Sequence, residues 1–448
     1  MNLNFLKEIY DNSPLFIKRI YSKMPIGVRH SRDYKACISI LNTPPIDIEK
    51  FQFEKLKSTL IFAYENTQYY EELFNEIQFN PYKFRNIEEF SVVPVLSKDI
   101  VKKNFDKLLI KSFDKSKNFY VTTGGTTGQQ SKFWQSNNVW KKEMAYVHYY
   151  WGKYNYTHKQ LKASFRGGEF PNSYWKYNPI QNEIHFSPFH INTETIDVYV
   201  NKLNDLKPLF FHGYPSSILS LIDNMNLKSK KLDYHLSCIF LVSENYTKDQ
   251  IKKIKDFFKC DIFTFYGHSE RLVFAPSIDK DLTLYKPDSF YGFFELVDNK
   301  NETITANNIS GEIIGTSFDN YAMPLIRYKT GDKTSFADID NNIINCIEGR
   351  WKQEYLEGVN GQKITLTALN LHSDVLKNVL NYQFYQKKAG DAVLFIKINS
   401  SFSEFDKKKI LVALNRKAGH VINFSIKIVD EFKLTERGKF KLLINKIK

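Results

Sequence analysis

The sequence contains little cysteine and no long apolar segment. Cys37, Cys238, Cys260 and Cys346 are the four cysteines among 448 residues, and no pair has the spacing of a metal site or of a disulfide framework. No run of 18 apolar residues is present, so no membrane-spanning helix is expected. The segment MNLNFLKEIYDNSPLF at the start lacks a continuous apolar stretch, so no signal peptide is expected. These absences favour a protein of the reducing cytoplasm.

Positive charge exceeds negative charge along the chain. Lys and Arg number 63 against 49 Asp and Glu, which gives a formal net charge of +14 at pH 7. One interpretation is an anionic partner such as a nucleotide, a nucleic acid or an anionic lipid; the other is a lysine-rich composition without a functional meaning. The basic residues are dispersed, whereas a nucleic-acid-binding protein clusters them. We therefore expect no nucleic-acid partner.

The basic, amphipathic first 25 residues leave two interpretations open. A helix docked on the protein's own core is the first, and peripheral contact with a membrane surface is the alternative.

The overall composition, with 42% hydrophobic and 25% charged residues, is that of a globular protein. At roughly 150 residues per domain, the length predicts about three domains, or one large and one small domain.

From about residue 205 the sequence alternates between short apolar runs and amphipathic segments. Apolar runs at 209–211, 238–242 and 260–266 predict buried strands. Pro215 is placed to open one helix, and Thr247 with Gln250 forms a capping box for another. Strands that alternate with helices predict a largely parallel sheet, in which ligands bind beyond the carboxyl ends of the strands.

The remaining sequence predicts different structure on either side of this region. Residues 1–115 are predicted to be mostly helical, and alternating patterns from about residue 290 predict β-hairpins. Near the end, a strand at 392–398, a helix capped by Ser403 and Asp406, and a strand at 424–429 predict a small α+β unit. The expected fold class is α/β, with a large domain of mixed sheets and helices at residues 1–352 and a small α+β domain at 353–448. We place the boundary between Arg350 and Glu357.

The Gly/Thr stretch at 122–128, TTGGTTG, is the strongest local motif. Three glycines allow a close approach of the backbone to a ligand, and consecutive N–H groups can form a nest for an anion. The stretch lacks the GxxxxGK[ST] pattern of the nucleotide-hydrolysing P-loop proteins. It therefore predicts a phosphate-binding loop of another kind, with a hairpin that binds no ligand as the alternative.

The stretch YGHSE at 266–270 follows a predicted buried strand. Tyr266 is placed to stack on a base, and the Glu270 carboxylate is the oxygen ligand that Mg²⁺ prefers. The alternative is a tyrosine packed in the core beside a solvated glutamate. His268 is more typical of a structural histidine than of a catalytic base.

Two further stretches suggest nucleotide contacts, each with a simpler alternative. In YKTGD at 328–332, Asp332 follows a strand at a tight turn and has the carboxylate to accept two ribose hydroxyls; Gly-Asp turns without a ligand are also common. Arg350 is able to reach a phosphate or a ribose, or is an ordinary surface arginine. TERGKFK at 435–441 predicts a flexible basic loop, with a solvated tail as the alternative.

Taken in order, these stretches resemble the adenylate-forming superfamily of acyl-CoA synthetases, peptide-synthetase adenylation domains and luciferases. TTGGTTG is similar to the phosphate loop of that family, YGHSE to its YGxTE signature and YKTGD to its YRTGD motif. EGR at 348–350 is similar to its hinge motif, and TERGK to its TxxGK segment. HGYPSSI at 212–218, LVSENYT at 241–247 and YGHSER at 266–271 resemble the phenylacetate–CoA ligase-like branch, including its relatives in capsular-polysaccharide biosynthesis.

The resemblance implies a large N-terminal adenylation domain and a small, mobile C-terminal lid domain. It also implies activation of a carboxylic acid by ATP and Mg²⁺, with an acyl-adenylate and pyrophosphate as products. Lys439 and Glu270 are the implied catalytic residues, and Glu270 with Thr127 would hold the metal. The implied nucleotide-binding residues are Thr123, Gly124, Gly125, Thr126, Thr127, Gly128, Ser243, Glu244, Tyr266, Gly267, Asp332 and Arg350. Implied for the acyl substrate are Arg166, His212, Tyr214 and His268.

Two residues depart from the family pattern. Gln130 stands where the family has a proline after the phosphate loop, and Gln353 stands at its hinge position. We expect an amine acceptor, possibly linked to a sugar, in cell-surface polysaccharide biosynthesis. The alternatives are an acyl- or aryl-CoA ligase, which transfers the acyl group to the thiol of CoA, and a catalytically idle relative that binds nucleotide.

Overall fold

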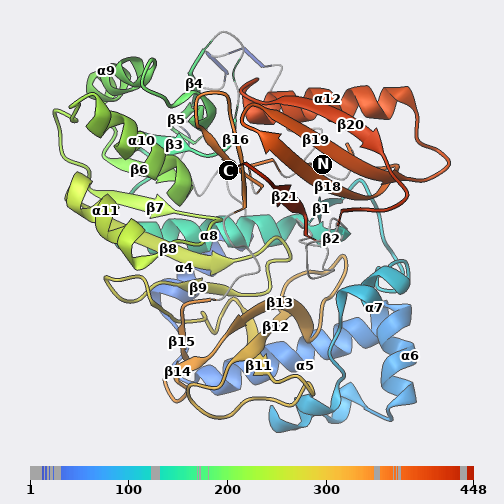
Figure 1. The fold of residues 1–448 in the computed structure, drawn as a ribbon. Helices are drawn as coiled ribbons and strands as arrows, with labels where there is room; N and C mark the ends of the chain where they lie inside the picture. The colour runs from blue at the N-terminus through green and yellow to red at the C-terminus, as the bar shows by residue number, and fades with distance from the viewer. Residues whose placement is uncertain are drawn as a thin grey trace. The chain divides into compact units, whose positions relative to one another are not determined.

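The fold is seen in a computed structural model (Figure 1). It describes residues 32–122, 132–168, 173–179, 181–347, 354–366, 375–433 and 441–447, together with residues 13, 14, 16, 17, 20, 24, 170, 368, 369 and 371. The chain divides into two compact units. The first comprises residues 1–121, 132–157 and 264–350, and the second comprises 122–131, 158–263 and 351–448.

The first unit combines helices with small sheets. Its helices are α4 (Arg32–Asn42), α5 (Ile48–Asn66), α6 (Gln68–Glu76), α7 (Lys98–Lys103) and α8 (Asn137–Gly152), with 3-10 turns at Pro81–Lys83 and Glu88–Val92. One antiparallel sheet has the order β11 (Gly292–Val297), β12 (Gly311–Ser317) and β13 (Tyr328–Thr334), and a second has the order β10 (Leu284–Tyr285), β15 (Ile343–Asn345) and β14 (Phe336–Asp338). β1 (Asn118–Thr122) pairs with β2 (Lys132–Ser136). The helical prediction for the region before residue 115 is confirmed for α4 to α7.

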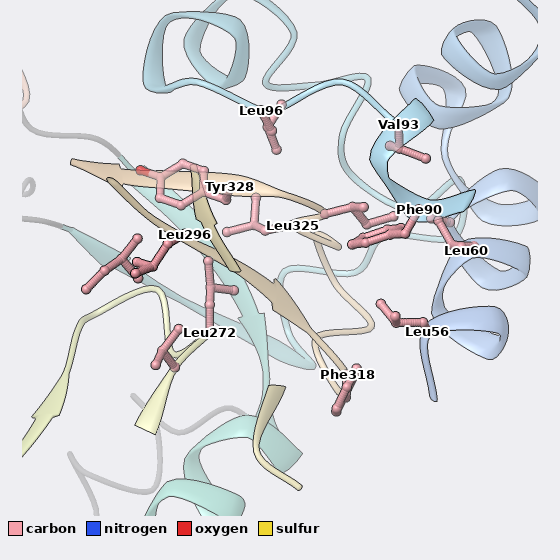
Figure 2. Close-up of a cluster of buried hydrophobic side chains, with 14 of the residues drawn as sticks. Leu56, Leu60, Phe90, Val93, Leu96, Leu272, Leu296, Phe318, Leu325 and Tyr328 are labelled. Carbon is pink, nitrogen blue, oxygen red and sulfur yellow. The ribbon is translucent and has the colours of Figure 1, made fainter. Parts of the chain in front are cut away.

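The core of the first unit lies between α5 and the β11–β13 sheet. Figure 2 shows Leu56 and Leu60 of α5 in the same cluster as Leu296 of β11 and Tyr328 of β13. All four side chains are buried. Burial of each leucine side chain contributes about 1.5–3 kcal/mol to the free energy of unfolding. This packing fixes β13, whose residues form part of the candidate site.

The second unit is built on the predicted parallel sheet. Its strands are β4 (Trp175–Asn178), β5 (Glu183–Phe186), β3 (Lys162–Phe165), β6 (Phe210–Gly213), β7 (Cys238–Leu241) and β8 (Asp261–Gly267), in that spatial order. β3 is parallel to β5 and β6, and β6 is parallel to β7. β8 continues into the first unit, where its end pairs with the antiparallel strand β9 (Phe274–Pro276). The helices between the strands are α9 (Ile196–Leu206), α10 (Pro215–Leu227) and α11 (Lys248–Phe258), with a 3-10 turn at Pro188–His190.

The end of the chain adds a small α+β layer to the second unit. β16 (Tyr355–Glu357) pairs with β17 (Lys363–Thr365), and a four-stranded sheet has the order β20 (Asn423–Ile428), β19 (Asp391–Ile398), β18 (Val379–Lys388) and β21 (Leu443–Asn445). Helix α12 (Glu404–Ala418) lies along this sheet (Figure 1). It buries Ile410 and Leu414 in the same cluster as Phe384 and Leu394. The α/β class and the small C-terminal α+β fold are thus confirmed.

Local signals placed several helix boundaries correctly. The capping box of Thr247 and Gln250 begins α11, the one of Ser403 and Asp406 begins α12, and Pro215 opens α10. One local expectation differs: Asp332 was predicted to follow a strand at a tight turn, but it lies inside β13, which runs on to Thr334. The domain boundary stays a prediction, since residues 348–353 lie outside the described part of the chain.

Candidate functional site

Tyr266 and Asp332 meet at the carboxyl end of β8. The Tyr266 hydroxyl donates a hydrogen bond to Oδ2 of Asp332 at 3.0 Å, although 66 residues separate them. Burial raises the pKa of Tyr266, and the neighbouring Asp332 carboxylate raises it further. The phenol therefore stays protonated and remains a donor, which holds Asp332 in place.

A β-bulge in β13 carries Asp332 to this position. Glu312 pairs with Lys333 and Ile314 pairs with Lys329, so residues 330–332 lie opposite Ile313 alone. Gly331 has a φ of 80°, in the left-handed region that glycine adopts without strain. The hydroxyl of Thr330 accepts the Asp332 N–H at 3.1 Å and donates to the Ile313 carbonyl at 2.9 Å. Bulges redirect side chains next to binding sites, and this one directs Asp332 toward Tyr266.

Glu270 is a buried carboxylate with several partners. The Tyr328 hydroxyl donates to Oε1 at 3.1 Å, and Nδ1 of His268 lies 3.5 Å from Oε2. Burial alone would raise the pKa of Glu270, but the adjacent His268 and the charge of Lys98 outweigh it, so the pKa is lowered. The carboxylate is therefore ionised at neutral pH and suited to bind a cation.

The loop that carries Glu270 is anchored to the strand before α8. The amide nitrogen of Gln135 on β2 donates to the Ser269 carbonyl at 2.8 Å, and the Arg271 guanidinium donates to the Gln135 side-chain oxygen. The His268 ring contacts Tyr266 edge to face, with ring centroids 5.7 Å apart. The first unit thus brings together Tyr266, His268, Glu270 and Asp332, which the sequence analysis singled out from two separate motifs.

The residues around Glu270 fit a magnesium ion that arrives with a nucleotide. Among the described residues, no group of three or more His, Cys, Asp or Glu side chains is arranged to hold a metal ion. Magnesium is usually bound by one or two carboxylates together with substrate phosphates. A single ionised carboxylate, as at Glu270, matches that arrangement, whereas a preformed protein cage would need more ligands.

Ser243 and Glu244 lie at the carboxyl end of β7 in the second unit. Ser243 has a φ of 64°, and the Ser216 N–H at the start of α10 donates to Oε2 of Glu244 at 3.1 Å. Burial raises the pKa of Glu244, although the neighbouring Thr365 and Ser216 oppose the increase. Glu244 thereby accepts from the start of α10 and has Thr365 of β17 as a neighbour.

The predicted substrate residues Arg166, His212 and Tyr214 lie near one another in the same unit. Nε of Arg166 donates to Oγ of Ser164 at 3.1 Å. Burial lowers the pKa of His212 well below its ordinary value, and Arg166 adds to the effect. Burial raises the pKa of Tyr214, and the nearby Arg166 and the Gly167 backbone oppose the increase. His268, the fourth predicted substrate residue, lies in the first unit.

Several predicted residues lie outside the described part of the chain. These are Thr123, Gly124, Gly125, Thr126, Thr127, Gly128, Gln130, Arg350, Gln353 and Lys439. Their roles stay predictions.

Polar residues that no motif indicated also lie at the two clusters. Tyr328 was treated only as part of a motif, and Lys98 was not considered. Lys162 and Glu183 form a buried ion pair at 3.3 Å. A charged residue at the start of an otherwise buried strand, as in KASF at 162–165 and EIHF at 183–186, is the signal that would have found this pair.

Comparisons with known proteins agree with the motifs. The family model described as the CapK C-terminal domain matches residues 356–446. Protein CapK of Staphylococcus aureus is 24% identical over 465 residues, which cover 99% of this chain and all of that protein. The phenylacetate-coenzyme A ligase of Pseudomonas putida is 21% identical over 69% of this chain and 71% of its own. These matches confirm the resemblance to the adenylate-forming superfamily.

A solved structure shows the same fold. The 2-hydroxyisobutyryl-CoA ligase, in complex with 2-HIB-AMP and CoA, superposes with a TM-score of 0.57 at 16% identity and covers 91% of each chain. At this identity the likeness concerns the fold alone. Within the described residues, no helix is long and apolar enough to cross a membrane.

Proposed function

We propose that this chain, a relative of the adenylate-forming enzymes, uses ATP to activate a carboxylic acid and then transfers the acyl group to an amine. The observation that carries the proposal is the meeting of the Tyr266–Asp332 pair with the ionised Glu270 carboxylate in one unit. We place the reaction in the cytoplasm, in the biosynthesis of cell-surface polysaccharide.

The residue types suit the first half-reaction. Asp332 is to accept the ribose hydroxyls of ATP, Tyr266 is to pack against the base, and Glu270 with Thr127 is to hold Mg²⁺. When bound, that ion supplies positive charge that offsets the charge of the phosphates. A carboxylate oxygen must attack an α-phosphate that is itself anionic, so the protein contributes mainly position and positive charge. Lys439 is proposed to add that charge at the attacking carboxylate as pyrophosphate leaves.

In the second half-reaction, the acceptor attacks the acyl carbon and AMP leaves. Similarity to Protein CapK along nearly the whole chain supports the polysaccharide-associated branch that the motifs resemble, and the amine acceptor is proposed from that branch. The amine nitrogen forms the new bond to the acyl carbon and releases a proton to solvent. Gln353 at the hinge position is a departure that accords with an altered second step.

A second candidate function is an acyl- or aryl-CoA ligase. Similarity to phenylacetate-coenzyme A ligases of Pseudomonas putida and Aromatoleum evansii supports it, and CoA would then be the thiol acceptor. An idle nucleotide-binding relative is the alternative from a different class. The joint presence of Glu270, Asp332 and Lys439 argues against that alternative.

The test is acid-dependent exchange between ATP and labelled pyrophosphate. A panel of amino, aryl, fatty and uronic acids is screened without any acceptor, and active acids are then offered CoA and amines. We expect exchange with at least one acid and product formation with an amine. Normal ATP binding without exchange for any acid would support the idle relative, and efficient thioester formation with a simple aryl or fatty acid would support the CoA ligase.

A further inference from the structure

Glu270 lies in a tight turn between β8 and β9. The Arg271 N–H donates to the His268 carbonyl at 2.9 Å, which closes the turn around Ser269 and Glu270. Arg271 has a φ of 54°, in the left-handed region that residues other than glycine rarely adopt. Such a conformation persists only where the surrounding structure determines it. The side-chain contacts of the turn therefore show what holds Glu270 in place.

The side chain of Gln135 on β2 holds the residues on either side of Glu270. Its amide nitrogen donates to the Ser269 carbonyl at 2.8 Å, and its amide oxygen accepts from the Arg271 guanidinium. Gln135 has no exposed surface, and both ends of its amide are used. The backbone of Glu270 is therefore unable to shift relative to β2 without breaking at least one of these hydrogen bonds.

Two aromatic rings hold the Arg271 guanidinium. Its Cζ lies 5.7 Å from the centre of the Phe119 ring on β1 and 5.3 Å from the centre of the Trp140 ring on α8. A guanidinium at these distances is attracted to the face of an aromatic ring. Arg271 thus contacts β1, β2 and α8 at once, and all of these elements contribute the contacting residues from within the first unit.

The carboxylate of Glu270 is restrained as well as its backbone. The hydroxyl of the buried Tyr328 on β13 donates to Oε1 at 3.1 Å. The backbone is held by Gln135 and Arg271 and one carboxylate oxygen is held by Tyr328, so the side chain has little freedom to change its position. A ligand that is fixed in this way favours a metal ion with strict geometric demands.

We propose that Gln135 and Arg271 form a clamp that positions the Glu270 carboxylate for Mg²⁺ and makes it select Mg²⁺ over Ca²⁺. The inference rests on the proposed function only for the arrival of the metal ion with ATP. Mg²⁺ requires near-ideal octahedral geometry with short bonds, whereas Ca²⁺ accepts flexible sites of varied geometry. Gln135 and Arg271 act through Glu270, so they are positioning residues.

The experiment measures how strongly each metal ion promotes the binding of ATP to the full chain. Calorimetry gives the Kd of ATP with excess Mg²⁺, with excess Ca²⁺ and with a chelator in place of both. The promotion by a metal ion is the Kd with the chelator divided by the Kd with that ion. For the wild-type chain we expect a larger promotion by Mg²⁺ than by Ca²⁺.

Variants at Arg271 test the clamp without adding backbone strain. Arg271→Asn removes the guanidinium, and asparagine tolerates the left-handed region. The variant should lower the promotion by Mg²⁺ about tenfold, near the lower end of the loss when a residue that orients a metal ligand is removed. The promotion by Ca²⁺ should change by less than about threefold, because Ca²⁺ tolerates a flexible ligand. Arg271→Lys keeps a cation and a donor for Gln135 and should recover part of the promotion by Mg²⁺.

Gln135→Met tests the same clamp from its other partner. Methionine keeps the length of the side chain but removes both hydrogen bonds, so the promotion by Mg²⁺ should again fall. Gln135→Met combined with Arg271→Asn should lose no more than the larger single loss, because the two residues act as one unit.

Lys153→Gln is the matched control. Lys153 follows α8 in the first unit and also lies over two aromatic rings, at 5.0 Å from the centre of the Tyr149 ring and 4.5 Å from that of the Tyr150 ring. Its loss should change neither promotion. Thermal unfolding identifies any variant that fails to fold, and the milder Arg271→Lys then provides the comparison between the two ions.

The outcomes separate the clamp from the reaction. A loss of promotion by Mg²⁺ without a matching loss for Ca²⁺, together with no ATP–pyrophosphate exchange for any acid, supports the clamp and contradicts the proposed function. Acid-dependent exchange together with equal losses for both ions, or with no loss beyond that of Lys153→Gln, overturns the clamp and leaves the proposed function standing. ATP binding to the wild-type chain that does not depend on Mg²⁺ would also overturn the clamp.

Discussion

Two buried glutamates, one in each unit, have opposite electrostatic settings. Glu270 at the end of β8 lies beside His268 and within the field of Lys98, and its pKa is lowered despite burial. Glu244 at the end of β7 lies among neutral groups, with the Ser216 N–H as its donor and Thr365 nearby, and burial raises its pKa. The family resemblance implied a nucleotide contact for Glu244 and a catalytic, metal-holding role for Glu270, yet the neighbouring groups decide which carboxylate keeps its charge.

The difference indicates different uses for the same residue type. An ionised carboxylate near a lysine, such as Glu270 near Lys98, is able to exchange a protein partner for a metal ion. A carboxyl group whose charge is disfavoured is better suited to a structural hydrogen bond, as Glu244 makes with the Ser216 N–H at the start of α10. A position at the end of a strand therefore identifies a glutamate as a candidate site residue. The surrounding charges then decide whether that glutamate is suited to bind a metal ion or to make a structural hydrogen bond.

The largest effect is expected at Lys439, the cation that the sequence pairs with Glu270 in the reaction. Lys439→Ala should lower ATP–pyrophosphate exchange about 10²–10³-fold, since one preorganised charge at the reacting atoms is lost. ATP affinity and thermal stability should change little. Exchange rates at saturating ATP, together with calorimetric ATP binding, measure the two effects separately.

Lys441 is the matched control for this variant. Its amine lies 3.9 Å from the Glu354 carboxylate, and its side chain is 54% exposed, so Lys441→Ala should lose far less activity. Lys439→Ala should also complete acyl transfer when it is given a preformed acyl-adenylate. Equal losses of exchange activity in the two lysine variants would contradict the catalytic role of Lys439. They would also weaken the argument that the charge around each carboxylate decides its use.

Glu270→Gln tests the ionised glutamate directly. The amide keeps the shape but cannot bind a cation strongly, so exchange should fall about 10²-fold, near the lower end of the loss for one electrostatic group. Higher Mg²⁺ concentrations should recover part of the activity. Glu312→Gln, which removes a carboxylate paired with Lys329 at 3.2 Å, is the control, and equal losses in both variants would contradict the assignment of Glu270.

The same variant has a predicted pH dependence. Because the pKa of Glu270 is lowered in the folded protein, its ionisation stabilises the fold above the ordinary glutamate pKa of about 4.3. This contribution is lost as the pH falls through the lower folded value. Denaturant unfolding should therefore show the largest deficit for Glu270→Gln near neutral pH and a shrinking deficit in acid.

Much of the fold followed from local signals. Capping boxes at Thr247 and Ser403, and the proline that opens α10, act within a few residues, so their effect is visible in the sequence. The apolar runs predicted β6, β7 and β8 because a buried parallel strand needs such a run. The motif order predicted that Tyr266, Glu270 and Asp332 belong to one site.

The parts that were missed depend on contacts between distant segments. Tyr328 donates to Glu270 across 58 residues, and Lys162 meets Glu183 because β3 and β5 are neighbours in register. The bulge at Gly331 depends on pairing with β12, so YKTGD alone suggested a turn. A single motif does not determine which strands pair or in which register they pair. Both become visible only when the sheets are assembled.

Gly331→Ala tests how the bulge holds Asp332. Alanine at a φ of 80° is strained and should cost about 1–2 kcal/mol in the free energy of unfolding. Relaxation of this strain should shift Asp332 away from Tyr266 and raise the KM for ATP more than it lowers kcat. Gly361, which has a φ of 75° on an open turn, is the control: Gly361→Ala should show a similar loss of stability without the change in KM.

The smallest effect is expected at Glu244, and its sign is opposite to that at Glu270. The raised pKa means that ionised Glu244 destabilises the fold at pH values above its folded pKa. Glu244→Gln keeps an acceptor for the Ser216 N–H but carries no charge. The variant should therefore be as stable as the wild type or more stable by up to about 1 kcal/mol at pH 8, within the range of a single hydrogen bond.

The gain at Glu244 should disappear in acid. As the pH falls through the raised folded pKa toward the ordinary value of about 4.3, wild-type Glu244 takes up a proton and loses its disadvantage, so the two proteins converge. Denaturant unfolding at several pH values measures this difference, and Glu194→Gln at an exposed position should show none of it. If Glu244→Gln were instead less stable at pH 8 and recovered in acid, then Glu244 would have to lie near a cation as Glu270 does. The two glutamates would then not differ in their electrostatic settings, and both carboxylates would be suited to bind a cation.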